Sequence, residues 1–192
     1  MFTGIVREIG RLAKKTPGGK AGMHLSILSK KMRPQIGASI AVNGVCLTIT
    51  KKTPGGFMVD VVSETLARTN LGKLKTNAAL NLEPSMKIDD ALDGHFVLGH
   101  VDTTCNVISN GKYLTIELPK KLAQFIAEKG SVALNGVSLT VAAVAKNSFT
   151  VALIPFTKKH TNLGGLKNGD SINVEIDILA RYAHRYNRLA VQ

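Results

Sequence analysis

Short apolar segments rich in Val, Ile, Leu and Thr follow one another along the chain and are separated by residues that favour turns. Pro17-Gly18-Gly19, Pro54-Gly55-Gly56 and Asn110-Gly111 are examples of these turn sequences. Apolar runs bounded in this way are typical of antiparallel strands joined by hairpins. The pattern predicts six strands in each half of the chain, over 2–13, 22–29, 38–43, 45–52, 56–62 and 79–84, and over 94–108, 112–118, 131–134, 136–145, 148–154 and 170–176.

The two halves repeat one another. Val42–Thr48 (VNGVCLT) returns as Leu134–Thr140 (LNGVSLT), 92 positions later and with no insertion between the matches. The same displacement relates Thr69–Gly72 to Thr161–Gly164, and Asn81–Glu83 to Asn173–Glu175. A period this long indicates a domain duplication, because solenoid and propeller repeats run at roughly 20–50 residues. Six short strands per half favour a closed barrel, which leaves no exposed sheet edge.

Short helices are expected at a few places outside the strands. Pro119 precedes an amphipathic stretch over 120–127, and Glu64–Arg68 and Thr157–His160 are candidate helical turns in equivalent positions. The tail over 178–191 has no counterpart in the first half, and its apolar residues fall on one side of a helix. They are Ile178, Tyr182, Tyr186 and Leu189. Such a stripe either covers its own barrel or joins copies of the chain, and the spacing does not decide between these.

These elements predict an all-β protein, in which two tandem duplicated barrels are followed by a tail. The charged stretch over 83–93 is the expected linker, so the predicted units are 1–90, 91–177 and 178–192. The copies differ at polar positions, with Cys46 opposite Ser138 and Ser85 opposite Asp177. Duplication for stability alone gives no reason for these differences. Two related pockets with different linings would explain them.

Composition narrows the function classes. The 192 residues are 44% hydrophobic and 20% charged, as in globular proteins, and no stretch is long and apolar enough to cross a membrane. The N-terminal residues lack the features of a signal peptide, which predicts a cytoplasmic protein. Cys46 and Cys105 are the only cysteines, which leaves structural zinc and a disulfide framework unsupported. The net charge is +12, but the lysine pairs are scattered and Trp is absent, so nucleic acid is not the expected partner.

The densest polar segment is Gly94–Asp102, which contains His95, His100 and Asp102. On a regular strand two histidines five residues apart point to opposite faces, so we expect no metal site, although a bulge at Gly99 would reverse this. A hydrogen-bonded structural role is expected for His95, and His100 is the better site candidate.

Each Asn-Gly-Val-x-Leu-Thr segment is a tight turn followed by an alternating strand. Alternation places Cys46 with Thr48 on one face, and Ser138 with Thr140 on one face. A thiol or hydroxyl beside backbone amides suits a heterocycle with hydrogen-bonding edges. The alternative is that these residues only cap the turn.

Five motifs in order resemble the riboflavin synthase family, alpha-chain type, across essentially the whole chain. They are Met1–Val6, Asn43–Thr48, Ser63–Gly72, Gly94–Asp102 and Gly136–Thr140. The resemblance implies two six-stranded Greek-key barrels, a homotrimer held by the C-terminal helix, and no cofactor or metal. It implies dismutation of two molecules of 6,7-dimethyl-8-ribityllumazine into riboflavin and 5-amino-6-ribitylaminouracil. Lumazine synthase, the enzyme that makes the substrate, is a candidate partner.

The resemblance also transfers site residues, with each ligand pair held between the barrels of neighbouring subunits. Those expected to assist chemistry are Cys46, His100, Ser138 and Asp177. The N-terminal barrel site is expected to comprise Gly4, Ile5, Val6, Ser39, Cys46, Leu47, Thr48, Asp60, Val61, Val62, Ser63, Glu64 and Thr65, closed by Phe2 and Thr3. The C-terminal barrel site is expected to comprise Gly99, His100, Val101, Ser138, Leu139, Thr140, Ala152, Leu153, Ile154, Pro155, Phe156 and Thr157, with Lys129 reaching across subunits.

A binding protein of the same fold is the principal rival hypothesis. Lumazine proteins resemble this family but hold one chromophore per chain and lack a competent second site. His100, Ser138, Thr140 and Asp177 are all present here, which favours the enzyme.

Overall fold

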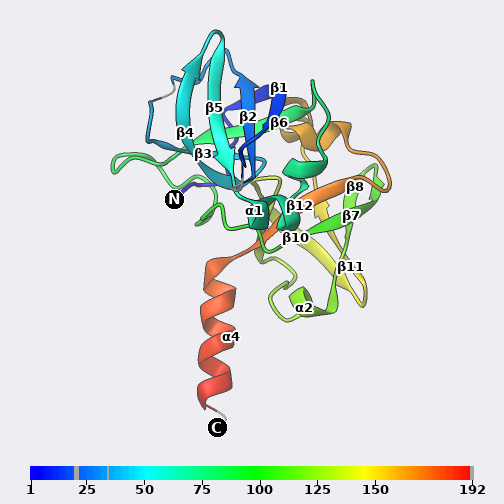
Figure 1. Cartoon of the computed structure of the whole chain (residues 1–192). Coiled ribbons are helices and arrows are strands. Elements are labelled where there is room, and N and C mark those ends of the chain that lie inside the picture. Colours follow the sequence, from blue (N-terminus) through cyan, green and yellow to red (C-terminus); the bar gives the residue numbers. More distant parts are fainter. Residues whose placement is uncertain (20–21, 34, 191–192) are drawn as a thin grey trace.

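The chain forms two closed antiparallel barrels of six strands each, as the sequence predicts (Figure 1). The computed structural model describes residues 1–19, 22–33 and 35–190. The strands of the first barrel follow the order β1-β2-β5-β4-β3-β6 around its wall. Their bounds are β1 Glu8–Pro17, β2 Met23–Leu28, β3 Ser39–Val42, β4 Val45–Thr53, β5 Gly56–Val61 and β6 Ala79–Pro84.

The second barrel repeats this topology, with each strand replaced by the one six places later. Its wall follows the order β10-β11-β8-β7-β12-β9. The bounds are β7 Thr103–Asn110, β8 Tyr113–Glu117, β9 Ser131–Leu134, β10 Val137–Ala145, β11 Ser148–Ala152 and β12 Ser171–Ile176. Even the β-bulges correspond, since the register shifts between Ile49 and Lys51 in one barrel and between Val141 and Ala143 in the other.

Alternation along each strand separates a barrel interior from an outer face. In β4, Val45, Leu47 and Ile49 are buried in the core, whereas Cys46 and Thr48 point outward. Each barrel therefore has its own apolar core, with Phe57 in the first and Phe149 in the second. Burial of these apolar side chains supplies the main driving force for folding of each half.

The helices lie outside the barrel walls, and all of them are short except the last. Their bounds are α1 Ser63–Arg68, α2 Lys120–Ala123, α3 Pro155–His160 and α4 Ile178–Ala190, and 3₁₀ turns cover Asn70–Lys73 and Asn162–Gly165. The expected helix over 120–127 stops at Ala123, because the next turn has hydrogen bonds between residues three apart, such as that from the Phe125 N–H to the Leu122 carbonyl. None of the helices in the described residues is long and apolar enough to cross a membrane.

Helix α4 projects beyond the barrels (Figure 1), but it contacts the second half of the chain through Arg181, which pairs with Asp102, and His184, whose ring packs on Phe125. Of the four residues of the expected stripe, Tyr182, Tyr186 and Leu189 are more than half accessible to solvent, whereas Ile178 is half-buried. Leu179, which the spacing did not include, is exposed beside them. The stripe therefore does not cover the chain's own barrel, which removes one of the two alternatives that the sequence leaves open. Residue 191 of the expected helix lies outside the described residues.

Two predicted strands differ from the structure in the same way. The strand expected over 94–108 begins at Thr103, and the one expected over 2–13 begins at Glu8. In each preceding segment a glycine adopts a left-handed backbone, with φ of 77° at Gly4 and 79° at Gly99. Buried carboxylates accept the N–H groups there, so these groups cannot join a sheet.

Asparagines at repeated positions join the barrels. The backbone N–H of Asn70 donates to Asn173 Oδ1 at 2.7 Å, and that of Asn162 donates to Asn81 Oδ1 at 2.7 Å. Asn43 and Asn135 complete the network by accepting from Asn162 Nδ2 and Asn70 Nδ2. All but Asn162 are buried, and the network satisfies polar groups that would otherwise be costly at this interface, except for Asn70 Oδ1, which has no hydrogen-bond partner among the described residues.

Candidate functional site

The expected site residues lie on the outer faces of the barrels. Cys46 and Thr48 point outward from β4 and face Ala41 and Ser39 of β3 in the register of the sheet. Ser138 and Thr140 point outward from β10 and face Ala133 and Ser131 of β9. The structure therefore forms two equivalent polar surfaces, with a thiol in one where the other has a hydroxyl.

Segments after the fifth strand of each barrel add to these surfaces. Asp60, one residue before the end of β5, is exposed and accepts hydrogen bonds from His24 and Thr50, with a distance of 2.6 Å between Asp60 Oδ1 and His24 Nδ1. Glu64 pairs with Arg68 on α1. In the second barrel Ile154 and Phe156 are exposed at 60% and 66%, on either side of Pro155. The second surface is thus more apolar than the first in this region.

Several expected ligand contacts point elsewhere. Leu47 and Val61 lie in the core of the first barrel, and Leu139 and Leu153 lie in the core of the second. Only their backbone groups are available to a ligand outside the wall. Phe2 is completely buried between the barrels, where it packs with Val97, Ala41 and Ala133.

The segments that contain Gly4 and Gly99 each contact the barrel that does not follow them directly in the chain. This exchange corrects the expected grouping of site residues. The carbonyl of Gly4, before the first barrel, accepts the N–H of Ser138 at 2.8 Å, and the carbonyl of Gly99, before the second barrel, accepts the N–H of Cys46 at 2.9 Å. Val6 packs on the second core and Val101 on the first. Gly4, Ile5 and Val6 therefore belong to the Ser138 surface, and Gly99, His100 and Val101 belong to the Cys46 surface.

This exchange follows from how the two segments pair. Phe2 and Val97 form an isolated antiparallel bridge, with Phe2 N–H to Val97 O at 2.7 Å and Val97 N–H to Phe2 O at 3.1 Å. The two segments cross at this bridge, and each then reaches the other barrel. Sequence order alone assigns each segment to the barrel that follows it, which is why the sequence-based grouping is wrong.

Two buried carboxylates hold the crossed segments. Glu83 accepts the N–H groups of Thr3 and Gly4, at 2.7 and 3.1 Å, and Glu175 accepts those of Leu98 and Gly99, at 2.7 and 3.0 Å. Burial raises the pKa of Glu83, and burial together with the charge of Asp102 raises the pKa of Glu175 to about 7. Sequence reasoning did not single out this pair, although the 92-residue displacement aligns the two glutamates.

The histidines differ between the two surfaces. His95 is buried, and its Nδ1 lies 2.7 Å from Ser138 Oγ. His100 is exposed and follows Gly99 beside Cys46. The hydrogen-bonded role expected for His95 is thus observed, but with a candidate site residue as the partner, which the sequence did not indicate. Among the described residues no group of three or more His, Cys, Asp or Glu side chains is arranged to hold a metal ion.

The remaining expected residues lie around these surfaces. Asp177 is half-buried ahead of α4, and its Oδ1 accepts the N–H of Leu179 at 2.9 Å. Lys129 is exposed and has a left-handed backbone, with φ of 64°. Its N–H donates to the Val141 carbonyl. Both residues are placed at the second barrel.

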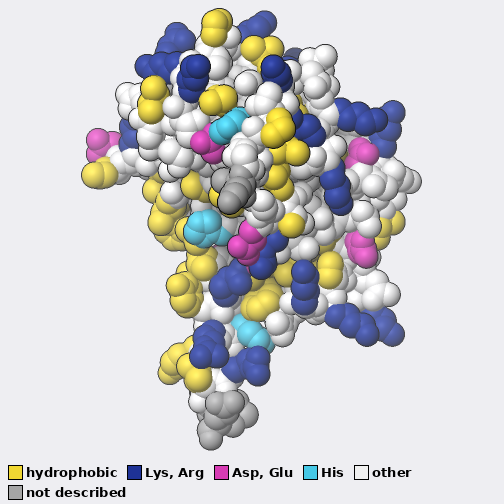
Figure 2. Space-filling view, viewed as in Figure 1, with side chains coloured by type: hydrophobic (Ala, Val, Ile, Leu, Met, Phe, Trp, Pro, Cys, Tyr) yellow, Lys and Arg dark blue, Asp and Glu magenta, His cyan; other side chains and the backbone are white. Residues whose placement is uncertain are grey.

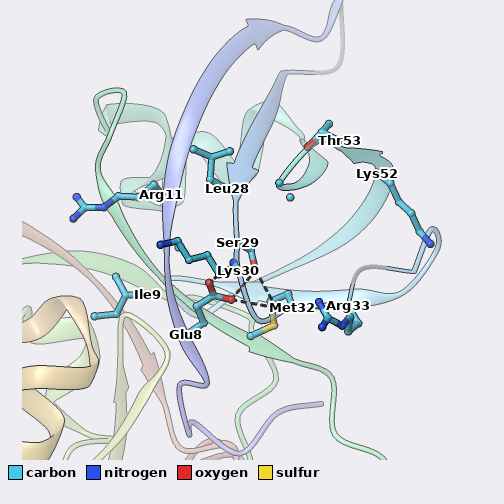
Figure 3. A pocket seen from close by; sticks show the side chains of 13 residues that line it. Glu8, Ile9, Arg11, Leu28, Ser29, Lys30, Met32, Arg33, Lys52 and Thr53 are labelled. Carbon is cyan, nitrogen blue, oxygen red and sulfur yellow. Dashed lines mark hydrogen bonds between the residues drawn. The ribbon is translucent and has the colours of Figure 1, made fainter.

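Three clefts of the described residues lie elsewhere. One of about 950 Å³ opens on the first barrel between Glu8, Leu28 and Arg33 (Figure 3), and a second of about 610 Å³ includes Ser39. Within the described part of the chain, neither Cys46 nor Ser138 lines these two clefts or the third, between the barrels. Neither polar surface therefore coincides with one of these three clefts.

On the face shown in Figure 2, basic side chains are spread out and do not form a single stripe. Figure 2 shows Lys and Arg spread over both barrels and along the projecting helix on the visible face. A continuous basic groove with aromatic platforms would be expected for single-stranded nucleic acid, and this face has no such arrangement.

Comparisons with known proteins agree with the duplicated fold. A family model described as "Lumazine binding domain" matches twice, at residues 3–85 and 98–177. The chain is 41% identical to the riboflavin synthase of Actinobacillus pleuropneumoniae over 97% of this chain and 89% of that protein. It is 39% identical to that of Mycobacterium bovis, over 99% and 100%. Crystal structures of LumP complexed with riboflavin and with 6,7-dimethyl-8-(1'-D-ribityl) lumazine share the fold, with TM-scores of 0.84 and 0.82 at 23% and 22% identity. Each covers 92% of this chain and 99% of its own.

Proposed function

We propose that this chain, which belongs to the riboflavin synthase family of lumazine-binding proteins, converts two molecules of 6,7-dimethyl-8-ribityllumazine into riboflavin and 5-amino-6-ribitylaminouracil. The observation that carries the proposal is the pair of equivalent but non-identical polar surfaces, one centred on Cys46 and one on Ser138. A dismutation needs such a pair, because one lumazine gives up a four-carbon unit and the other receives it.

The chemistry explains why the surfaces differ. One lumazine loses a proton from its C7 methyl and becomes a carbanion, whose charge the ring delocalises. The other accepts a nucleophile. Holding the two rings in contact supplies much of the rate by proximity, and nearby polar groups add proton transfer. The proposed groups are Cys46 and His100 at one surface, and Ser138 and Asp177 at the other.

A second subunit completes each site in this proposal. A ring on the open Cys46 surface would be covered by the Ser138 surface of a neighbour, so that the two reacting rings face each other. The exposed stripe of α4 supports a homotrimer held by this helix, because four large apolar side chains on one face are costly in water. In this arrangement residues 1–90 and 91–177 are the two lumazine-binding units, and 178–192 is the oligomerisation segment.

Two further proposals concern the setting of the reaction. Cys46 and Cys105 are both free thiols, as is common in a reducing compartment, which supports a cytoplasmic location. Lumazine synthase is the proposed protein partner, since it would deliver the substrate where it is used. Co-sedimentation of the two purified proteins tests this, and separate migration at micromolar concentrations would contradict it.

The experiment that tests the function mixes the purified protein with dimethylribityllumazine and no added cofactor. Riboflavin absorbance should appear, with one riboflavin formed for every two lumazines consumed. Tight binding with no turnover would instead favour a chromophore-binding protein. A Ser138→Ala variant that binds one ligand per chain and turns over slowly would show that both surfaces take part.

A further inference from the structure

His95 is a buried histidine whose ring nitrogens have different surroundings. Its exposed fraction is 8%, and Nδ1 lies 2.7 Å from the hydroxyl oxygen of Ser138. Nε2 is buried and has no hydrogen-bond partner among the described residues. A buried imidazole nitrogen without a hydrogen-bond partner lowers the stability of the fold, so its presence calls for an explanation such as a role in the reaction. The pairing with a half-buried hydroxyl on the ligand-facing surface indicates such a purpose.

The position of His95 is fixed by its backbone. Its N–H donates to the Thr3 carbonyl at 3.2 Å, and Thr3 is itself held by Glu83. A Cβ added to the preceding Gly94 would lie 2.0 Å from the Thr3 oxygen and 2.9 Å from Ser138 Cβ. Only glycine permits this approach, so the backbone before His95 lies close to Ser138 and brings the imidazole within reach of its hydroxyl.

The protonation state of His95 follows from the groups around it. Burial lowers its pKa, and the negative charge of Asp177 acts in the opposite direction. The Ser138 hydroxyl is the group bonded to the ring, and the Glu83 carboxylate binds Thr3, whose carbonyl accepts the backbone N–H of His95. At neutral pH the ring is therefore uncharged, and one of its nitrogens is free to accept a proton.

We propose that His95 acts through Ser138 as the positioning residue of the proton-removing site: Nδ1 accepts the Ser138 hydroxyl hydrogen, and the Ser138 oxygen presents its lone pairs to the ligand. When the C–H bond of the C7 methyl breaks, its proton joins the Ser138 oxygen and the original hydroxyl proton passes to Nδ1. The electron pair stays on the lumazine ring, and the resulting imidazolium faces the charge of Asp177. This inference rests on the proposed function and assigns proton removal to the C-terminal barrel.

The other surface lacks this arrangement. The N-terminal barrel has Cys46 in place of Ser138, and its histidine, His100, comes from the segment after Gly99 and is exposed. His100 makes no hydrogen bond to Cys46 in the described residues. The residue equivalent to His100 beside Ser138 is Ile5, whose side chain has no titratable group. The two surfaces are therefore suited to different steps.

The test uses three variants and two readouts. His95→Asn keeps an acceptor near the position of Nδ1 but takes up no proton, Ser138→Ala removes the hydroxyl, and the double variant combines them. Hydrogen–deuterium exchange of the C7 methyl, followed by NMR in D₂O, measures proton removal. Riboflavin formation across pH measures the whole reaction.

We expect His95→Asn to slow methyl exchange by roughly 10²-fold, a typical contribution of a general base. It should lower kcat more than it raises KM, and the acid limb of the pH profile, which reports protonation of His95, should disappear. Because His95 acts through Ser138, the double variant should be no slower than Ser138→Ala within about threefold.

Cys105→Ala is the matched control, since Cys105 is buried in the core of the same barrel and lies apart from the polar surface. It should lower thermal stability without changing the exchange rate or the pH profile. Unchanged exchange in His95→Asn, or independent losses that multiply in the double variant, would overturn the inference. A wild-type protein that forms no riboflavin would instead refute the proposed function itself.

Discussion

Gly44 and Gly136, which occupy equivalent positions in the two halves, touch each other through their backbones. A Cβ added to Gly44 would lie 2.6 Å from Gly136 N, and one added to Gly136 would lie 2.7 Å from Gly44 N. Both have left-handed φ values, 76° and 77°. The tight turns thus serve two purposes, since they join adjacent strands and allow the barrels to meet.

Gly44→Ala should destabilise the protein strongly. The positive φ alone costs about 1–2 kcal/mol for a residue with a Cβ, and the contact with Gly136 adds a steric cost, so we expect at least about 3 kcal/mol in total. Gly37→Ala is the control, because Gly37 has a φ of 85° but no atom within 4 Å of an added Cβ. Urea unfolding measures both. Equal losses in the two variants would show that the contact is unimportant.

The exchange of segments makes a prediction about binding. A Cβ on Gly4 would lie 2.6 Å from Ser138 Cβ, and one on Gly99 would lie 2.5 Å from Cys46 Cβ. Gly4→Ala should therefore impair the same ligand site as Ser138→Ala, although Gly4 precedes the other barrel. Gly99→Ala should impair the same site as Cys46→Ala. Calorimetric titration with dimethylribityllumazine should show about one weakened site per chain in each case.

Gly169→Ala serves as the control for these two variants, because Gly169 has a φ of 85° and open space around it. It should leave both sites intact. If Gly4→Ala instead weakened the site that Cys46→Ala weakens, the crossing of the two segments would be refuted.

Glu175 should make stability depend on pH. Burial, with the charge of Asp102, raises its pKa to about 7, against the effect of the hydrogen bonds from the Leu98 and Gly99 N–H groups. A carboxyl whose pKa is higher in the folded state binds its proton more tightly there than in the unfolded chain. Its contribution to stability is therefore full below the ordinary value of 4.5 and is lost as pH rises to about 7, by up to about 1.4 kcal/mol per pH unit.

Glu175→Gln removes this ionisation and should flatten the dependence between pH 5 and pH 7, even though Gln accepts fewer hydrogen bonds and lowers stability at acid pH. Guanidinium unfolding at several pH values measures the slope. Glu128→Gln, at an exposed position, should keep the wild-type slope. A slope that is the same in Glu175→Gln and wild type would show that Glu175 ionises normally.

The apolar stripe of α4 should determine the oligomeric state. Tyr186 is 73% exposed in the single chain, so a charge there harms only an assembled helix interface. Tyr186→Lys should convert the proposed trimer to smaller species in sedimentation velocity and reduce riboflavin formation at least tenfold, because the site needs two subunits. Asn187→Lys, one position along the same helix, should change neither. A Tyr186→Lys trimer with full activity would contradict the role of this helix.

The sequence determined the duplicated architecture and much of the ligand-facing chemistry. Alternation along 45–52 and 136–145 places Cys46 and Ser138 on outer faces because the side-chain period of a strand is fixed at two. The repeat established two barrels with the same topology, since equal patterns bury equal faces. The apolar spacing over 178–191 likewise predicted α4.

Only the tertiary structure decided which segment serves which barrel. The bridge between Phe2 and Val97, the hydrogen bonds to Glu83 and Glu175, and the contact of His95 with Ser138 join residues far apart in the chain. Local pattern carries no information about such pairs, because a strand's periodicity fixes the direction of a side chain and not the partner it meets. The exchange of Gly4 and Gly99 between barrels depends on those long-range contacts, and so does the pairing of His95 with Ser138.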